Sequence, residues 1–176
     1  PVYYESRVIK LKLNDEVLAQ IDAEYDRLRE EGASEADLEA NKKEMSHMDA
    51  LLGNDATIND LVNDIITHYE DNRQHICCGK AMIVAYSRPI AMKIYKRILE
   101  LRPEWTEKVK VVMTSGNQDP EEWADIIGGK AYKKELAKKF KDENDPMKIA
   151  IVVDMWLTGF DVPSLATMYV YKPMKD

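Results

Sequence analysis

The sequence predicts an α/β fold: a parallel β-sheet with helices on both faces, preceded by an acidic helical segment. Short continuous apolar runs, such as KIAIVV, predict strands that are buried on both faces, which is typical of parallel sheets. In the second half of the chain these runs alternate with helical segments, and parallel strands need such crossover connections. The 176 residues are enough to bury a core without disulfides or metal.

Charge divides the chain into two parts. Residues 1–75 carry 8 Lys and Arg against 18 Asp and Glu, a net charge of −10, whereas residues 76–176 carry 17 against 14, a net charge of +3. The total of −7 argues weakly against a nucleic-acid partner, but the second part can accept a polyanion. We therefore predict an acidic helical unit at residues 1–75 and an α/β domain at residues 76–176.

The acidic unit shows helical periodicity over most of its length. After a loosely alternating stretch at residues 1–12, helices are predicted from Asp15 and over residues 34–53. A third helix is predicted to begin near Asp55 or Thr57. Its expected buried side is an apolar stripe at helical spacing: Ile58, Leu61, Val62, Ile65, Ile66 and Tyr69.

The α/β domain alternates strands and helices. Apolar runs predict four strands, at residues 81–86, 108–114, 148–154 and 167–172. Helices are predicted at residues 87–101, with a proline near the first turn, and at residues 132–142. Because loops at the carboxyl ends of parallel strands hold ligands, the residues after each strand are the candidates for function.

The first two strand ends carry groups that suit a phosphate. Ser87 and Arg88 follow the first strand at the start of a helix, where backbone amides, a hydroxyl and a guanidinium can bind an anion. Thr114, Ser115 and the amide of Gly116 follow the second strand. Taken alone, each loop also fits a structural interpretation, the first as a helix cap with a surface arginine and the second as a polar turn.

The third strand ends in DMWLTGFDVP. Thr158 and the flexible Gly159 can approach a phosphate closely, and Asp161 can accept hydrogen bonds from a sugar hydroxyl. Alternatively, Asp161 caps a helix that begins at the following residues. Three phosphate-suited loops on one sheet edge favour the interpretation as a binding site over three unrelated turns.

Other kinds of site find little support. GKA at Gly79 lacks the remaining residues of a phosphate-binding P-loop. The three histidines are too scattered for a metal set, so we predict no metal ligands and no catalytic nucleophile in this chain. Cys77 and Cys78 are adjacent in an apolar context and expected to be buried, which fits neither a disulfide framework nor a zinc site and favours a reducing cytoplasm.

Three segments carry a resemblance to a known family: KAMIVAYSRPIAMKIYKRI, KVVMTSGNQDPEEW and ELAKKFKDENDPMKIAIVVDMWLTGFDVPSLATMYVYKPMK. They resemble the second RecA-like motor domain of the R subunit of type I restriction-modification enzymes, which are superfamily 2 translocases. The resemblance is close over residues 79–175, and DMWLTGFD with its following proline is specific to the group. The acidic part resembles the connector between the two motor domains.

The resemblance implies roles for the strand-end residues. It implies DNA-backbone contacts for six residues: Ser87, Arg88, Thr114, Ser115, Gly116 and Thr158. It implies that Gly159 and Asp161 face the nucleotide, with Asp161 near the ribose.

It further implies a parent protein that is a type I site-specific deoxyribonuclease with ATP-dependent translocase activity, using ATP and Mg2+. The implied partners are double-stranded DNA, the first motor domain of the same chain, and the methyltransferase and specificity subunits, with no membrane. Since the P-loop, the Mg2+ ligands, the nuclease acids and the later arginine motif are missing from the sequence, we expect an inactive, cytoplasmic fragment of that parent. Another superfamily 2 helicase, or a non-catalytic α/β protein-interaction module, remains an alternative.

Overall fold

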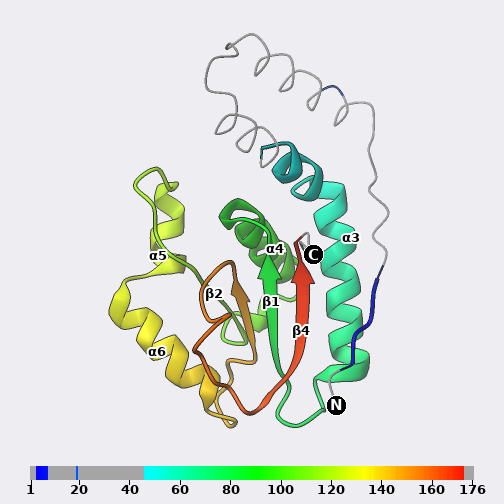
Figure 1. Cartoon of the computed structure of the whole chain (residues 1–176), viewed down its shortest axis with the longest axis vertical. Helices are drawn as coiled ribbons and strands as arrows, with labels where there is room; N and C mark the ends of the chain where they lie inside the picture. The colour runs from blue at the N-terminus through cyan, green and yellow to red at the C-terminus, as the bar shows by residue number, and fades with distance from the viewer. Residues whose placement is uncertain (1–2, 8–18, 20–45, 173–176) are drawn as a thin grey trace. The chain divides into compact units, whose positions relative to one another are not determined.

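Figure 1 shows the chain as a computed structural model, which describes residues 3–7, 19 and 46–172. The chain divides into two compact units, Pro1–Leu61 and Val62–Asp176. The helix predicted from Asp15 and most of the helix predicted at residues 34–53 lie outside the described residues. Residues 46–52 are helical, and Gly53 follows them as a turn, as expected for the end of that helix.

The second unit contains a four-stranded sheet in which every strand pair is parallel. Its strands are β1 (Lys80–Ala85), β2 (Val109–Val112), β3 (Ile149–Val152) and β4 (Leu165–Tyr171), in the order β2-β3-β1-β4. The first and third strands lie in register from Ala81 opposite Ile149 to Val84 opposite Val152. All four predicted strands are therefore confirmed, and the predicted α/β class with them.

Helices cover both faces of the sheet. On one face, Met82, Val84 and Val152 share a core with Leu136 and Phe140 of α6 (Lys130–Lys141). Neighbouring residues of a strand point to opposite faces, so the alternate strand residues face the other side. The helix α4 (Arg88–Leu101) connects β1 to β2 across β3, and α6 returns from β2 to β3; with right-handed crossovers these two connections lie on opposite faces.

The third predicted helix is α3 (Asp55–His68), which continues into a short π-helix, η1 (Tyr69–Arg73). The whole predicted apolar stripe is buried: Ile58, Leu61, Val62, Ile65, Ile66 and Tyr69. The end of this helix belongs to the same compact unit as the sheet. Its last turn also contacts the edge strand, since the imidazole Nδ1 of His68 lies 2.8 Å from the hydroxyl of Tyr169 on β4.

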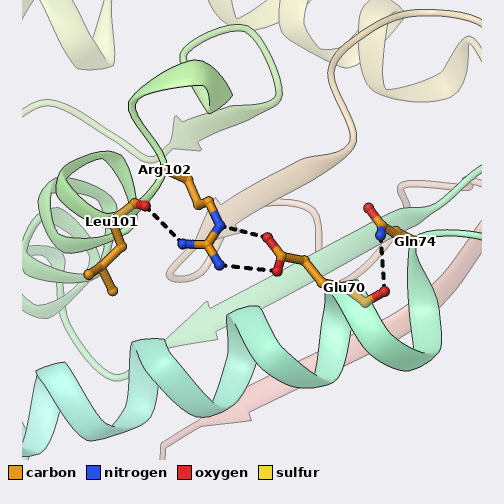
Figure 2. A network of polar contacts seen from close by, with 4 residues as sticks. All are labelled: Glu70, Gln74, Leu101 and Arg102. Atoms are coloured by element: carbon orange, nitrogen blue, oxygen red, sulfur yellow. Dashed lines mark hydrogen bonds and ion pairs between the residues drawn. The ribbon is translucent and has the colours of Figure 1, made fainter.

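A polar network ties η1 to the end of α4 (Figure 2). Arg102 donates from Nε and Nη2 to the two carboxylate oxygens of Glu70, at 2.6 and 3.1 Å, and from Nη1 to the carbonyl of Leu101. Gln74 donates to the backbone carbonyl of Glu70 at 3.0 Å. The hydrogen bond from Arg102 lowers the pKa of Glu70. This ion pair holds the segment just before residue 75 against the α/β domain.

The two cysteines differ from the expectation. Cys77 is exposed and Cys78 is half-buried, and both are free thiols, so the expected burial was wrong. They lie in the turn that leads into β1, where Cys77 adopts a positive φ of 53° and the chain reverses at the surface. In the described part of the chain, no helix is long and apolar enough to cross a membrane.

Candidate nucleic-acid interface

The loops after β1, β2 and β3 leave the same edge of the sheet. Because these three strands are parallel, their carboxyl ends coincide, and β3 lies between the other two. The loop that contains Thr158 therefore starts between the loop of Ser87 and Arg88 and the loop of Thr114. This placement on one edge is the one that the sequence predicts.

Ser87 and Arg88 form the start of α4. Ser87 has an extended backbone and is the N-cap, and its hydroxyl accepts a hydrogen bond from the amide of Ile90 at 3.4 Å. A cap of this kind stabilises the helix whatever else the residue does. Arg88 is the first helical residue, a position where the helix dipole disfavours a cation and favours an anion. An acid or an anionic ligand close to the guanidinium therefore stabilises an arginine at this position.

Arg88 is held by the loop that follows β2. Its Nε donates to the carbonyl of Thr114 at 2.9 Å, and its Nη2 forms an ion pair with the carboxylate of Asp119. Its guanidinium carbon lies 5.7 Å from the ring centre of Trp123. The side chain of Arg88 remains 27% exposed. Two of the predicted loops are thus joined through one guanidinium.

Asp119 belongs to this site although the sequence does not predict it as a site residue. Its carboxylate accepts the amide hydrogen of Gly116 at 2.7 Å in addition to the bond from Arg88. Hydrogen bonds from Arg88 and from Gly116 lower the pKa of Asp119. The sequence does contain one sign of this contact, an acid three residues after a glycine, since both residue types are common in turns. The Gly116 amide, which the sequence predicts as a phosphate ligand, donates to Asp119 in the structure. The side chains of Thr114 and Ser115 are exposed.

The loop after β3 is exposed at its tip. Thr158, Gly159 and Asp161 are all exposed, and Gly159 has a φ of 68°, which few residues other than glycine adopt. In the part of the chain that the structure describes, the carboxylate of Asp161 has no hydrogen-bond partner. No helix follows Asp161, only a turn and then β4, so the alternative of a helix cap was wrong.

An aromatic stack fixes the base of this loop. The indole of Trp156 stacks on two rings, that of Phe140 on α6 with centroids 5.6 Å apart and that of Phe160 with centroids 4.3 Å apart. The ammonium of Lys141 lies 4.7 Å from the ring centre of Phe160. Phe160 packs against the core cluster, so it anchors the loop. The aromatic contacts of Trp156 and Phe160 therefore hold the loop in place below its exposed residues Thr158 and Gly159.

Comparison with known proteins gives the same family for the whole chain. Residues 106–176 match the family model for domain 3 of type I restriction enzyme subunit R. Over its full length the chain is 41% identical to a putative type I restriction enzyme MjaIXP endonuclease subunit of Methanocaldococcus jannaschii. Over 99% of its length it is 38% identical to the type I restriction enzyme HindI endonuclease subunit of Haemophilus influenzae.

The chain belongs to the R subunits of type I restriction enzymes. It spans about 16% of the length of each of these two relatives. The match to the R-subunit family model includes the loops after β2 and β3, and the two relatives extend the similarity over β1 and the loop that holds Arg88.

The residues of this R-subunit segment suit a nucleotide sugar better than a metal ion. Asp161 offers an exposed acceptor without a partner among the described residues, which fits a ribose hydroxyl. Among the described residues there is no group of three His, Cys, Asp or Glu side chains that could hold a metal ion.

Proposed function

We propose that this chain is part of the ATP-driven DNA translocase of a type I restriction enzyme and contributes contacts to the DNA backbone. The observation that carries the proposal is the gathering of three polar loops at the carboxyl edge of one parallel sheet, two of them joined through Arg88. In the proposed organisation, residues 76–176 are the second motor domain and residues 1–75 are the connector from the first. Membership of the R-subunit family supports this organisation.

The chemistry of the loops suits a motor. A translocase has to hold phosphates at every step without reading bases, and hydroxyls, amides and guanidinium groups do this because phosphates are the same at every position. Thr114, Ser115 and Thr158 offer exposed hydroxyls, and Arg88 offers charge. Ser87 and Gly116 shape the loops that carry these groups.

The nucleotide lies on the far side of the loop after β3 in this proposal. Gly159 lets the backbone turn at a positive φ, and Asp161 accepts a ribose hydroxyl. When bound, ATP with Mg2+ supplies the phosphoryl group whose hydrolysis drives movement. The chain has no P-loop sequence, so the phosphates and Mg2+ are held by the first motor domain of the same subunit, and this chain by itself does not hydrolyse ATP or cut DNA.

The relatives are named endonuclease subunits, and we extend that activity to the complete protein that contains this chain. Its proposed partners are double-stranded DNA and the methyltransferase and specificity subunits of the restriction complex. Specificity for a DNA site then lies outside this chain, which agrees with loops built from groups that bind phosphates.

The test compares two arginines of α4 in the complete subunit. Arg88→Ala removes the proposed phosphate contact, whereas Arg97→Ala removes the same charge nine residues further along the helix, where Arg97 pairs with Glu100 at 2.7 Å. For Arg88→Ala we expect weaker binding to duplex DNA of any sequence and a slope of log affinity against log salt that is smaller by about 0.9. The Arg97→Ala variant should keep the slope. Equal slopes for both variants would favour the interaction-module alternative.

A further inference from the structure

The guanidinium of Arg88 is restrained on several sides. Nε is bonded to the carbonyl of Thr114, Nη2 to the carboxylate of Asp119, and the plane lies near the ring of Trp123. We propose that Asp119 is a positioning residue, which holds Arg88 in the orientation that receives a DNA phosphate. This inference rests on the proposed function, because it assumes that Arg88 contacts the DNA backbone.

The restraints leave one side of the guanidinium available. In the described part of the chain, Nη1 has no hydrogen-bond partner. It lies over Gly116, beside the exposed hydroxyl-bearing residues Thr114 and Ser115. A phosphate that bonds to Nη1 therefore also comes within reach of this loop. A free arginine side chain loses rotamer freedom when it binds, and a side chain that is already fixed loses less.

Gly116 is shaped to admit the guanidinium. A Cβ at this position would lie 2.9 Å from Nη1 of Arg88 and 3.2 Å from Oδ1 of Asp119. The φ of Gly116 is not in the positive region, so the backbone conformation is not the reason for glycine here. The close approach of the Arg88 guanidinium is the reason. Gly116 thus leaves room for the guanidinium of Arg88, and Asp119 binds that guanidinium.

Asp119 is built into its turn rather than placed as a substitute for phosphate. One carboxylate oxygen accepts from both the Gly116 amide and Arg88, and the amide of Asp119 in turn donates to the carbonyl of Gly116 at 3.2 Å. A phosphate that displaced this carboxylate would break the turn that presents Thr114 and Ser115. Keeping Asp119 in place and binding the phosphate at Nη1 breaks no bond.

The first test separates geometry from charge at this position. Asp119→Asn and Asp119→Ala both remove the negative charge, but only asparagine keeps an oxygen that can accept from Arg88 and Gly116. In the complete subunit at one salt concentration, we expect Asp119→Ala to bind duplex DNA roughly three- to tenfold more weakly than Asp119→Asn. In an Arg88→Ala background the difference between the two variants should be clearly smaller, because only the turn that presents Thr114 and Ser115 then still depends on the accepting oxygen.

Gly116→Ala provides a test without any change of charge. The new methyl group forces the flexible end of Arg88 to move, which costs little stability but removes the held orientation. We expect a similar three- to tenfold loss of DNA affinity, roughly the cost of ordering one side chain, and no further loss in the Arg88→Ala background. Melting temperatures of all variants show whether the fold is intact.

The outcomes distinguish the inference from the proposed function. If Arg88→Ala itself leaves DNA affinity and its salt dependence unchanged, the assignment of Arg88 to the DNA backbone fails. If Arg88→Ala weakens binding but Asp119→Ala binds as well as or better than Asp119→Asn, the positioning role fails alone. Tighter binding by both Asp119 variants than by the parent protein, with Asp119→Ala no weaker than Asp119→Asn, identifies the carboxylate as a competitor of the phosphate.

Discussion

The indole of Trp156 lies nearly parallel to the ring of Phe160, with centroids 4.3 Å apart and an angle of 12° between the planes. Trp156 also has a φ of 67°, and this left-handed conformation costs a residue other than glycine roughly 1–2 kcal/mol. Stacking on Phe160 and on Phe140 offsets that cost. The loop with Thr158 and Gly159 is therefore held by aromatic contacts that begin in α6.

Two substitutions of Trp156 separate the stack from the strain. Both Trp156→Ala and Trp156→Gly remove the stack, but only glycine adopts the left-handed conformation without strain. We expect both variants to be destabilised, with Trp156→Gly more stable than Trp156→Ala by about 1 kcal/mol. Urea unfolding of the chain measures the difference. The usual order, with alanine the more stable, would show that the backbone at this position is not strained.

The ion pair between Glu70 and Arg102 predicts a dependence of stability on pH. The hydrogen bond from Arg102 lowers the pKa of the Glu70 carboxyl in the folded chain. The ion pair therefore stabilises the fold above the ordinary glutamate pKa, and this contribution is lost as the pH falls through the lowered pKa. We expect Glu70→Gln to cost about 0.5–1 kcal/mol at pH 7, since the pair is partly exposed. The difference between the two proteins should shrink as the pH falls below the ordinary glutamate pKa of about 4.3.

A matched control for this measurement is Glu121→Gln. Glu121 is exposed, and no ion pair involves it in the described part of the chain. Its substitution should change the free energy of unfolding little at any pH in the same range. If Glu70→Gln and Glu121→Gln give the same pH profile, the bond from Arg102 does not stabilise the junction between η1 and α4.

Ser87 predicts a separation of helix capping from DNA binding. Asparagine and aspartate cap helices about as well as serine, whereas alanine costs about 1 kcal/mol. We expect Ser87→Asn and Ser87→Asp to keep the stability of the chain within a few tenths of a kcal/mol. In the complete subunit, Ser87→Asp should bind DNA more weakly than Ser87→Asn, because it places a negative charge beside the proposed phosphate. Equal DNA binding by the two variants would confine Ser87 to capping.

The sequence predicts the elements of this fold well because local signals specify them. Continuous apolar runs predict β1 and β3, and a serine before a proline in the first turn predicts the start of α4. Local signals do not specify the order of the strands. β2 pairs with β3 and not with β1, and this pairing depends on contacts between segments that are far apart in sequence. Local patterns do not specify such pairings.

The same limit applies to the site. Parallel strands bring the three loops to one edge, so their proximity is predictable from the elements alone. The bond between Arg88 and Asp119 joins residues 31 positions apart, and it depends on how the loop after β2 folds back over the start of α4. The helix-cap interpretation of Asp161 failed because the segment after it, which contains Pro163, forms a turn that leads into β4.

Asp161 gives the sharpest prediction for the coupling of nucleotide and DNA. It lies three residues after Thr158 on the same exposed loop tip, with Gly159 between them at a positive φ. In the proposed motor, Thr158 holds a DNA phosphate and Asp161 holds the ribose. Because the loop between them is short, a displacement of Asp161 also displaces Thr158. We expect Asp161→Asn in the complete subunit to slow ATP-driven translocation at least tenfold, as loss of one hydrogen bond to a charged group would. DNA affinity without nucleotide should change less than twofold, within the effect of a surface substitution.

Stability measurements complete this test. Since no helix begins at Asp161 and its carboxylate has no partner among the described residues, Asp161→Asn should leave the melting temperature of the chain unchanged. Thr158→Val is the matched variant, because it removes the hydroxyl from the DNA end of the same loop and keeps the shape of the side chain. It should weaken DNA binding and translocation together. Translocation at the normal rate by Asp161→Asn would show that the nucleotide does not use this carboxylate, and the loop would then serve DNA alone.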